Sequence, residues 1–101
     1  PCTPPGEVAV DLEFITAHDL AWTADPAVDG YGLYRGAMSG AWAYSHLCVA
    51  PMLRTPQAPD LAEPAPGQGY YYLVSGRGTC GEGNLGADSN GMPRPNARPC
   101  P

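Results

Sequence analysis

Short alternations of apolar and other residues, each ended by proline or glycine, constrain the fold of this chain more than any other feature. The clearest stretch is LAWTADPAVDGYGLYRG, residues 20–36. Leu20 and Trp22 lie two positions apart, as do Tyr31 and Leu33, so each pair presents one face of a pleated strand to a common core. The residues between the two pairs are rich in aspartate, proline and glycine, which favour turns. We therefore expect a β-hairpin-like unit here.

Two further alternations predict strands of the same kind. In GYYYLVSGRG, residues 69–78, the side chains of Tyr70, Tyr72 and Val74 share one face of a strand that is bounded by glycines. In EVAVDLEF, residues 7–14, valine, leucine and phenylalanine alternate with alanine and acidic residues. This second pattern is typical of a sheet with one solvated face.

The rest of the chain is less regular. Residues 41–53 predict one or two more strands, whereas four prolines within residues 54–66 exclude a central strand and favour an extended surface connection that Leu61 holds to the core. Residues 84–86 begin or form a short last strand. Residues 87–101 contain several prolines and no apolar alternation, so we expect a tail.

Several of these segments together resemble a fibronectin type III domain. LAWTA, GYGLYRG and PGQGYYYLVSGR followed by GEG are similar to its B, C, F and early G strands, over residues 7–86. The resemblance implies an all-β, immunoglobulin-like antiparallel sandwich of seven strands, of the kind found in secreted bacterial proteins. It makes Trp22 the buried tryptophan of strand B, Tyr31 and Leu33 inward residues of strand C, and Tyr70 the tyrosine-corner residue.

The expected organisation has three parts: an extended N-terminal arm at residues 1–6, the sandwich at residues 7–86 and a proline-rich C-terminal tail at residues 87–101. The tail either folds back on its own domain or reaches onto a neighbour, and we favour the neighbour. The expected core anchors are Trp22, Tyr31, Leu33, Tyr70, Tyr72 and Val74.

Composition excludes some partners. Ten acidic residues against five arginines and no lysine give a formal charge of −5, and the arginines are scattered along the chain. Such a chain repels a nucleic-acid backbone or an anionic membrane surface. We expect no nucleic-acid binding, no membrane insertion and no cofactor.

Four cysteines in a small, proline-rich β domain favour disulfides and an extracellular or cell-surface location. Three pairings of Cys2, Cys48, Cys80 and Cys100 are open. We expect Cys48 to pair with Cys80 across the sandwich. A second bridge between Cys2 and Cys100 then forms either within one chain or between neighbours.

Motifs for catalysis and metal binding are weak. A zinc site built from His18, His46, Cys48 and Cys80 lacks any CxxC pair. Ser45 and His46 are adjacent, so on a strand their side chains point to opposite faces, and no GxSxG motif is present. We expect a protein without enzymatic activity.

The sequence DSNG, residues 88–91, is a weak calcium candidate, because Asp88 and Asn90 offer alternate oxygen donors before a glycine. No acidic residue follows at the position that would complete a calcium loop. A simple turn explains this composition equally well.

Aromatic residues are a better indication of a binding surface. Tyr34, Trp42, Tyr44 and Tyr71 are expected to face outward, where flat rings can stack on sugars or contact a protein. Two functions follow. The first is a structural module that self-associates into a surface filament or tandem array through its terminal arms, or contacts neighbouring domains. The second is a carbohydrate-binding or adhesion module that accompanies a secreted enzyme.

Overall fold

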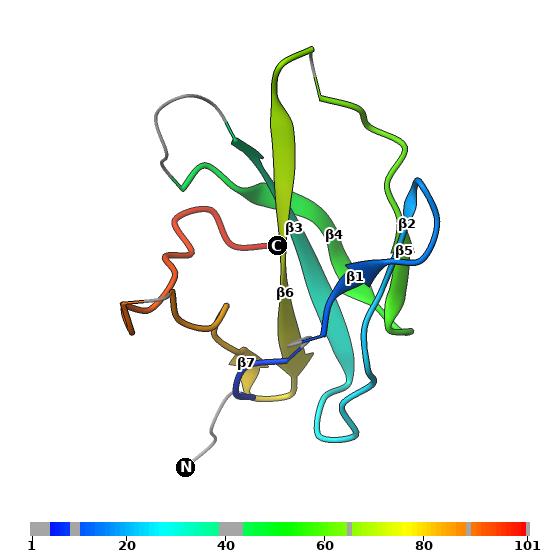
Figure 1. Ribbon diagram of the computed structural model, residues 1–101. Coiled ribbons are helices and arrows are strands. Elements are labelled where there is room, and N and C mark those ends of the chain that lie inside the picture. Colours follow the sequence, from blue (N-terminus) through cyan, green and yellow to red (C-terminus); the bar gives the residue numbers. More distant parts are fainter. Residues whose placement is uncertain (1–4, 9–10, 39–43, 65, 89, 101) are drawn as a thin grey trace.

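The computed structural model of the protein describes residues 5–8, 11–38, 44–64, 66–88 and 90–100. Within these ranges the chain forms seven β-strands and no helix (Figure 1). The strands are β1 (Glu13–Phe14), β2 (Asp19–Ala21), β3 (Gly30–Met38), β4 (Leu47–Leu53), β5 (Gln57–Pro59), β6 (Gly69–Gly78) and β7 (Gly81–Glu82). The expected all-β class is confirmed.

The strands form two antiparallel sheets in a sandwich-like arrangement. One sheet has three strands in the order β1-β2-β5, and the other has four in the order β4-β3-β6-β7. β3 and β6 are the longest strands, and they pair continuously from Gly30 with Arg77 to Met38 with Gly69. This long pair is the scaffold on which the other elements are placed.

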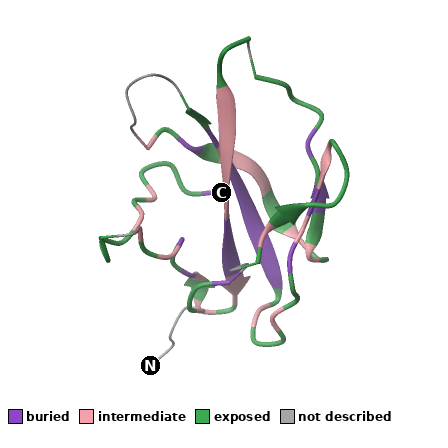
Figure 2. Cartoon of the chain, in the orientation of Figure 1, coloured by how far each residue is buried: buried purple, intermediate pink, exposed green. Residues whose placement is uncertain are grey.

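Apolar side chains between the two sheets form the main core. The buried members are Val8, Leu20, Trp22, Tyr31, Leu33, Ala58 and Val74. Trp22 packs edge-to-face against Tyr31, with ring centroids 5.4 Å apart. Figure 2 shows this buried band along β3 and the second half of β6. The period of two in the sequence therefore identifies residues that face a common core.

The other face of the four-stranded sheet is covered by residues 83–88 and 90–100, which we call the C-terminal strap. Figure 1 shows it in orange and red, leaving β7 and returning to the middle of the sheet. Leu85 and Cys100 pack on Tyr34 in a second buried cluster. The segment expected as a tail thus folds back on its own domain, and the favoured course onto a neighbour is not the one observed.

The expected hairpin between residues 20 and 36 is wrong in its pairing. β2 and β3 lie in different sheets. The backbone N–H of Trp22 donates to the carbonyl of Pro56 at 3.0 Å, so the chain stays with the three-stranded sheet past the end of β2. A turn at Asp25, whose carboxylate accepts the N–H of Ala27 at 2.9 Å, then leads across to β3.

Of the expected strand over residues 7–14, the described residues 7–8 and 11–14 contain β1 at the end and no other strand. Val8 still reaches the core, and Leu12 packs against it. The carboxylate of Asp11 accepts the backbone N–H of Thr23 at 2.9 Å and also the Thr23 hydroxyl. A side chain therefore takes the place of a backbone ladder at this point.

The proline-rich connection contains a strand that the sequence did not predict. β5 pairs with β2 at the edge of its sheet, where the missing N–H of a proline is tolerated. Leu61 does not hold this segment to the core, because its side chain is 76% exposed. Asp60 is the anchor, and it is buried.

The last strand also lies earlier than expected. β6 and β7 are joined by a two-residue turn at residues 79–80, and Gly81 has a φ of 105°, which favours glycine. β7 ends at Glu82, and residues 84–86 belong to the C-terminal strap.

Candidate functional site

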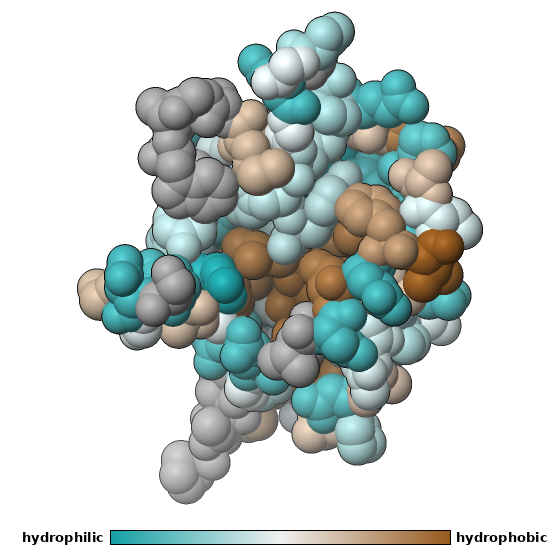
Figure 3. All heavy atoms as spheres, in the orientation of Figure 1, coloured by the Kyte–Doolittle hydropathy of each residue, from teal (hydrophilic) through white to brown (hydrophobic). Residues whose placement is uncertain are grey.

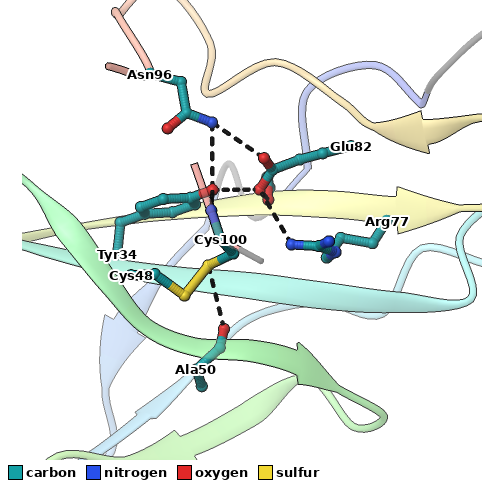
Figure 4. Close-up of a disulfide and its surroundings, with 8 residues drawn as sticks. Tyr34, Cys48, Ala50, Arg77, Glu82, Asn96 and Cys100 are labelled. Carbon is teal, nitrogen blue, oxygen red and sulfur yellow. Dashed lines mark hydrogen bonds and ion pairs between the residues drawn. A yellow bond between two sulfur atoms is a disulfide. The ribbon is translucent and has the colours of Figure 1, made fainter. Parts of the chain in front are cut away.

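A disulfide fixes the C-terminal strap to the edge strand β4. Cys48 is bonded to Cys100, with Cα atoms 5.0 Å apart (Figure 4). The expected Cys48–Cys80 pairing is therefore wrong, because Cys48 lies on the face of the sheet that the strap covers. The bridge proposed between Cys2 and Cys100 is wrong for the same reason. Cys80 is disulfide-bonded as well, and Cys2 lies outside the described residues.

The hydroxyl of Tyr34 is the centre of a buried polar network beside this disulfide. It donates to a carboxylate oxygen of Glu82 at 2.5 Å and accepts the backbone N–H of Cys100 at 2.8 Å and the amide of Asn96 at 3.2 Å. Figure 4 shows these groups converging from β3, β7 and the strap. Burial raises the pKa of Tyr34, and the bond to Glu82 raises it further.

Glu82 connects the same network to β6. Its carboxylate accepts the hydroxyl of Ser75 and the amide of Asn96, the latter at 3.1 Å, and lies 3.8 Å from the guanidinium of Arg77. Ser75 is completely buried. The polar residues on this face of β6 thus contact Glu82 of β7, which in turn binds Asn96 of the strap.

Four aromatic residues were expected on the surface, and for Tyr34 this expectation is wrong. Its ring does face away from the main core, as the alternation predicts, but the strap covers it and its exposure is 0%. Trp42 lies outside the described residues. Tyr44 and Tyr71 are partly buried, and both contact the ring of His46 edge-to-face, with centroids 5.9 and 5.8 Å away.

A pocket of about 320 Å³ lies beside this aromatic group, between the start of β4 and the strap. Its lining comprises Tyr44, Ser45, His46, Pro95, Ala97 and Arg98. Tyr44 is the residue of the expected surface aromatics that lines this pocket. The pocket combines a tyrosine ring with a histidine and an arginine.

His46 is buried and has both ring nitrogens bonded. Nε2 lies 2.7 Å from the carbonyl of Pro95, which can only accept, so Nε2 carries the proton. Nδ1 lies 2.9 Å from the hydroxyl of Tyr71, which accepts the N–H of Ser45 and donates to Nδ1. The Ser45 hydroxyl lies against the N–H of Ala37. Ser45 and His46 therefore do not form a nucleophile and base.

A second polar group lies on the core side of the four-stranded sheet. Asp60 receives two hydrogen bonds from Arg35, at 2.9 and 2.8 Å, and one from the Tyr72 hydroxyl at 2.8 Å. Burial alone raises the pKa of Asp60, but these bonds outweigh it and hold the pKa below its ordinary value. Burial and the nearby carboxylate raise the pKa of Tyr72 to about 12.

The expected core anchors separate into two groups. Trp22, Tyr31, Leu33 and Val74 are buried. Tyr70 and Tyr72 are partly buried. They line a second pocket, of about 340 Å³, together with Phe14, His18, Asp60 and Glu63. The ring of Tyr70 stacks on the guanidinium of Arg35 at 4.8 Å, and its hydroxyl donates to the carbonyl of Glu63 at 3.2 Å.

The metal candidates form structural contacts. One carboxylate oxygen of Asp88 accepts the backbone N–H groups of Asn90 and Met92, at 2.9 and 3.0 Å, which is the geometry of a turn. Cys48 and Cys80 are in disulfides, so neither offers a thiolate to zinc. Within the described ranges no three histidine, cysteine or acidic side chains are grouped to hold a metal.

Sequence reasoning missed Arg35, Asp60, Glu82 and Asn96, the residues that complete the two polar networks. Their partners are distant in sequence, so no local motif marks them. The outward positions of β6 after Leu73 are polar, Ser75 and Arg77, as on a solvated sheet face. No sequence signal therefore indicated that this face is covered.

Comparisons with protein-family models, curated proteins and solved structures gave no match. In the part of the chain that the structure describes, no helix has the length and apolar character that crossing a membrane requires.

Proposed function

We propose that this protein is a non-enzymatic structural module of the fibronectin type III-like class, which works outside the cell as a subunit of a surface filament or tandem array. Strand order supports the fold. Immunoglobulin-type sandwiches place strands A, B and E in one sheet and C, F and G in the other, with C′ at the edge beside C. The orders β1-β2-β5 and β4-β3-β6-β7 correspond to that arrangement.

Tyr70 supports the same class. A tyrosine corner near the start of strand F donates its hydroxyl to backbone a few residues upstream. Tyr70 is the second residue of β6, and its hydroxyl donates to the carbonyl of Glu63. The contact fixes the proline-rich connection that leads into β6.

The functional proposal rests on one observation: the buried polar side chains form hydrogen bonds with other groups of the same domain. Asp60 bonds to Arg35 and Tyr72, and His46 bonds to Tyr71 and a backbone carbonyl. A catalytic site needs groups that are free to meet a substrate. Because these polar groups bond to one another within the domain, they support a structural role that depends on a rigid domain.

The disulfides support a location outside the cell. The Cys48–Cys100 bridge joins β4 to the strap, and the cysteines of the described chain are all oxidised. Such bonds persist in oxidising compartments and are rare in the cytosol. Since Cys100 is held within its own domain, assembly must use surfaces other than a free C-terminal arm.

Carbohydrate binding is the second candidate. The pocket beside Tyr44 favours it, because an aromatic ring and Arg98 line it together. Sugars bind to such combinations of a ring face and polar groups. This candidate predicts retention of the oxidised chain on an insoluble polysaccharide such as cellulose or chitin, and loss of that retention in Tyr44→Ala.

Sedimentation velocity and negative-stain microscopy of the oxidised chain test the leading proposal. Ordered polymers, or a tandem repeat of two copies that unfolds at a higher temperature than one copy, support it. A chain that stays monomeric, and whose tandem repeat unfolds like the single copy, contradicts it. Binding to polysaccharide by that monomer then supports the second candidate.

A further inference from the structure

Among the described residues, one edge of β6 has no partner strand along most of its length. On one side β6 pairs with β3, and on the other it pairs with β7 only opposite Arg77 and Gly78. One more bond, from the N–H of Gly83 to the carbonyl of Gly76 at 2.8 Å, continues this contact. The chain then leaves the sheet as the C-terminal strap.

The open edge presents backbone donors and acceptors in a regular row. Backbone groups point alternately to the two sides of a strand. The carbonyl of Gly76 points toward β7. The backbone N–H and C=O groups of Tyr70, Tyr72 and Val74 therefore point to the same side, away from β3. Within the described chain, β3 and β7 are the strands paired with β6, and β7 ends before it reaches these residues. Among the described residues, the N–H and C=O groups of this stretch therefore have no partner strand.

The edge lies in a groove that combines apolar and polar side chains. A cavity of about 250 Å³ follows it, lined by the apolar Val8, Leu12, Leu73, Val74 and Leu85 and by Glu7, Tyr72 and Arg94. Val8 and Leu12 form one wall, and Leu85 of the strap belongs to the other. Figure 3 shows brown, apolar atoms in a hollow at the centre of this face.

This edge differs from the other strand edges of the described chain in its sequence and length. β4 contains Pro51 and β5 contains Pro59, and prolines block the edges on which they lie. β1 and β7 are two residues long. Residues 69–74, GYYYLV, contain neither proline nor charge. Natural sheets protect long edges that are not used.

Charge indicates the kind of strand that fits. The segment that forms one wall carries three exposed carboxylates, on Glu7, Asp11 and Glu13. The other wall contributes Arg94, whose guanidinium lies 3.9 Å from Glu7. The whole chain has a formal charge of −5. An occupant with basic residues is therefore attracted, and an acidic one is repelled.

We propose that this groove binds an extended peptide strand of a partner protein, one that has apolar residues at alternate positions and lysine or arginine beside them. The strand pairs with the free edge of β6 at Tyr72 and Val74 and places its apolar side chains in the groove. Main-chain bonds supply affinity and the groove supplies selection, as in other cases of strand addition. This inference goes beyond the proposed function and does not depend on it.

A second copy of the chain is a poor occupant. The edge is recessed between two walls, so the β6 edge of another folded domain, recessed in the same way, cannot reach it. A single strand without folded walls does not meet this obstacle.

Residue-resolved hydrogen exchange on the oxidised chain tests the proposal. The probe is a synthetic peptide, KTVTVTVR, with ETVTVTVE as the charge-reversed control. In the free protein the amides of Tyr72 and Val74 should exchange fast, while those of Leu73 and Ser75, which point to β3, are protected. Saturating KTVTVTVR should slow exchange at Tyr72 and Val74, and ETVTVTVE should have less effect at the same concentration.

A matched pair of variants locates the binding. Leu12→Lys places a positive charge on the apolar wall and should weaken binding of KTVTVTVR by about tenfold or more. Leu61→Lys makes the same change at a side chain that does not line the groove and should leave binding unchanged. Absence of protection at Tyr72 and Val74 with saturating peptide overturns the proposal. Protection that grows with protein concentration alone also overturns it, by making a second copy the occupant.

Discussion

Tyr34 shows how much of this structure depends on one hydroxyl group. It is a core-sized side chain on a face that alternation assigns to solvent, and it is buried because the strap covers it. Its hydroxyl bonds to three partners from β7 and the strap. A buried hydroxyl with three hydrogen-bond partners connects these segments in a way that no apolar side chain could.

We therefore predict that Tyr34→Phe destabilises the protein by about 1–3 kcal/mol, because the N–H of Cys100 and the carboxylate of Glu82 lose a buried partner. Chemical denaturation of the oxidised variant measures the change. Tyr70→Phe is the matched control. Its single bond to the Glu63 carbonyl is exposed, so its effect should be clearly smaller. Equal effects of the two substitutions would contradict the role given to the Tyr34 hydroxyl.

The lowered pKa of the Asp60 carboxyl leads to a prediction of how stability depends on pH. The hydrogen bonds that Asp60 receives from Arg35 and Tyr72 lower the pKa of its carboxyl in the folded protein below that of the unfolded chain. A lowered carboxyl pKa adds stability that is present above the unfolded pKa and is lost as the pH falls through the folded pKa. The free energy of unfolding should therefore fall below about pH 5.

Asp60→Asn tests this at the level of one group. The variant should be less stable at neutral pH, because Arg35 loses its carboxylate partner, and its stability should fall less steeply in acid. Denaturation at a series of pH values gives both quantities. Glu63→Gln, at an exposed side chain, should keep the parent's acid profile. A parallel acid decline in Asp60→Asn and the parent would exclude Asp60 as its source.

At the scale of the elements, the closeness of β3 and β6 depends on glycines as much as on the apolar residues. Gly36 lies opposite Tyr71, and a methyl group built on Gly36 would meet the Tyr71 ring at 2.1 Å. The tyrosine ring lies over the glycine and fills the space that a side chain would occupy. The bonds from the Tyr71 hydroxyl to His46 and Ser45 hold the ring there.

Gly36→Ala should therefore destabilise the protein by about 1–3 kcal/mol, since the Tyr71 ring and its contacts must move. Gly6→Ala is the control, because a methyl group there meets nothing within 4 Å. Thermal unfolding of the two variants compares them. A melting temperature for Gly36→Ala equal to that of Gly6→Ala would show that the Tyr71 ring moves without cost.

Sequence alternation was sufficient for some elements and insufficient for others, for physical reasons. β3 and β6 were predictable because their apolar residues keep a period of two along a buried face. Their partners were not, since the ladder that follows Trp22 pairs with the backbone at Pro56, a contact that side chains do not encode. β5 was hidden because proline is excluded from central strands but permitted at an edge.

For the candidate site, the sequence predicted the types of residue involved but not their arrangement. Aromatic residues at positions 44 and 71 indicated a surface, but nothing local showed that a histidine ring would lie between them. The pairing of the cysteines depended on the course of the strap, which has no alternation to reveal it. Spacing alone therefore left three connectivities open.

At the scale of the whole molecule, the Cys48–Cys100 bond joins positions that are 52 residues apart. A bond that closes a loop of this length restricts the unfolded chain and contributes about 4 kcal/mol on the chain-entropy model. Marginal stability is usual for a domain of this size. The strap is thus part of what keeps the sandwich folded.

Replacing both residues, in Cys48→Ser/Cys100→Ser, should lower the free energy of unfolding by about 4 kcal/mol and expose Tyr34 to solvent. Denaturation measures the first effect, and tyrosine absorbance during an alkaline titration measures the second. The titration should show one more tyrosine ionising near its ordinary pKa than in the parent, because burial and Glu82 raise the pKa of Tyr34 in the closed form. An unchanged titration would mean that hydrogen bonds alone keep the strap in place.

The position of Cys100 also affects the order in which the protein is made. Every strand is synthesised before Cys100, so both sheets can pair before the bond that locks the strap is able to form. Until then, Cys48 is a thiol on an uncovered sheet face, open to oxidants and to other thiols. Closure of the strap is therefore a covalent step that can follow the pairing of the described strands. Its rate is set by the redox chemistry of the surroundings, whereas strand pairing is set by the chain itself.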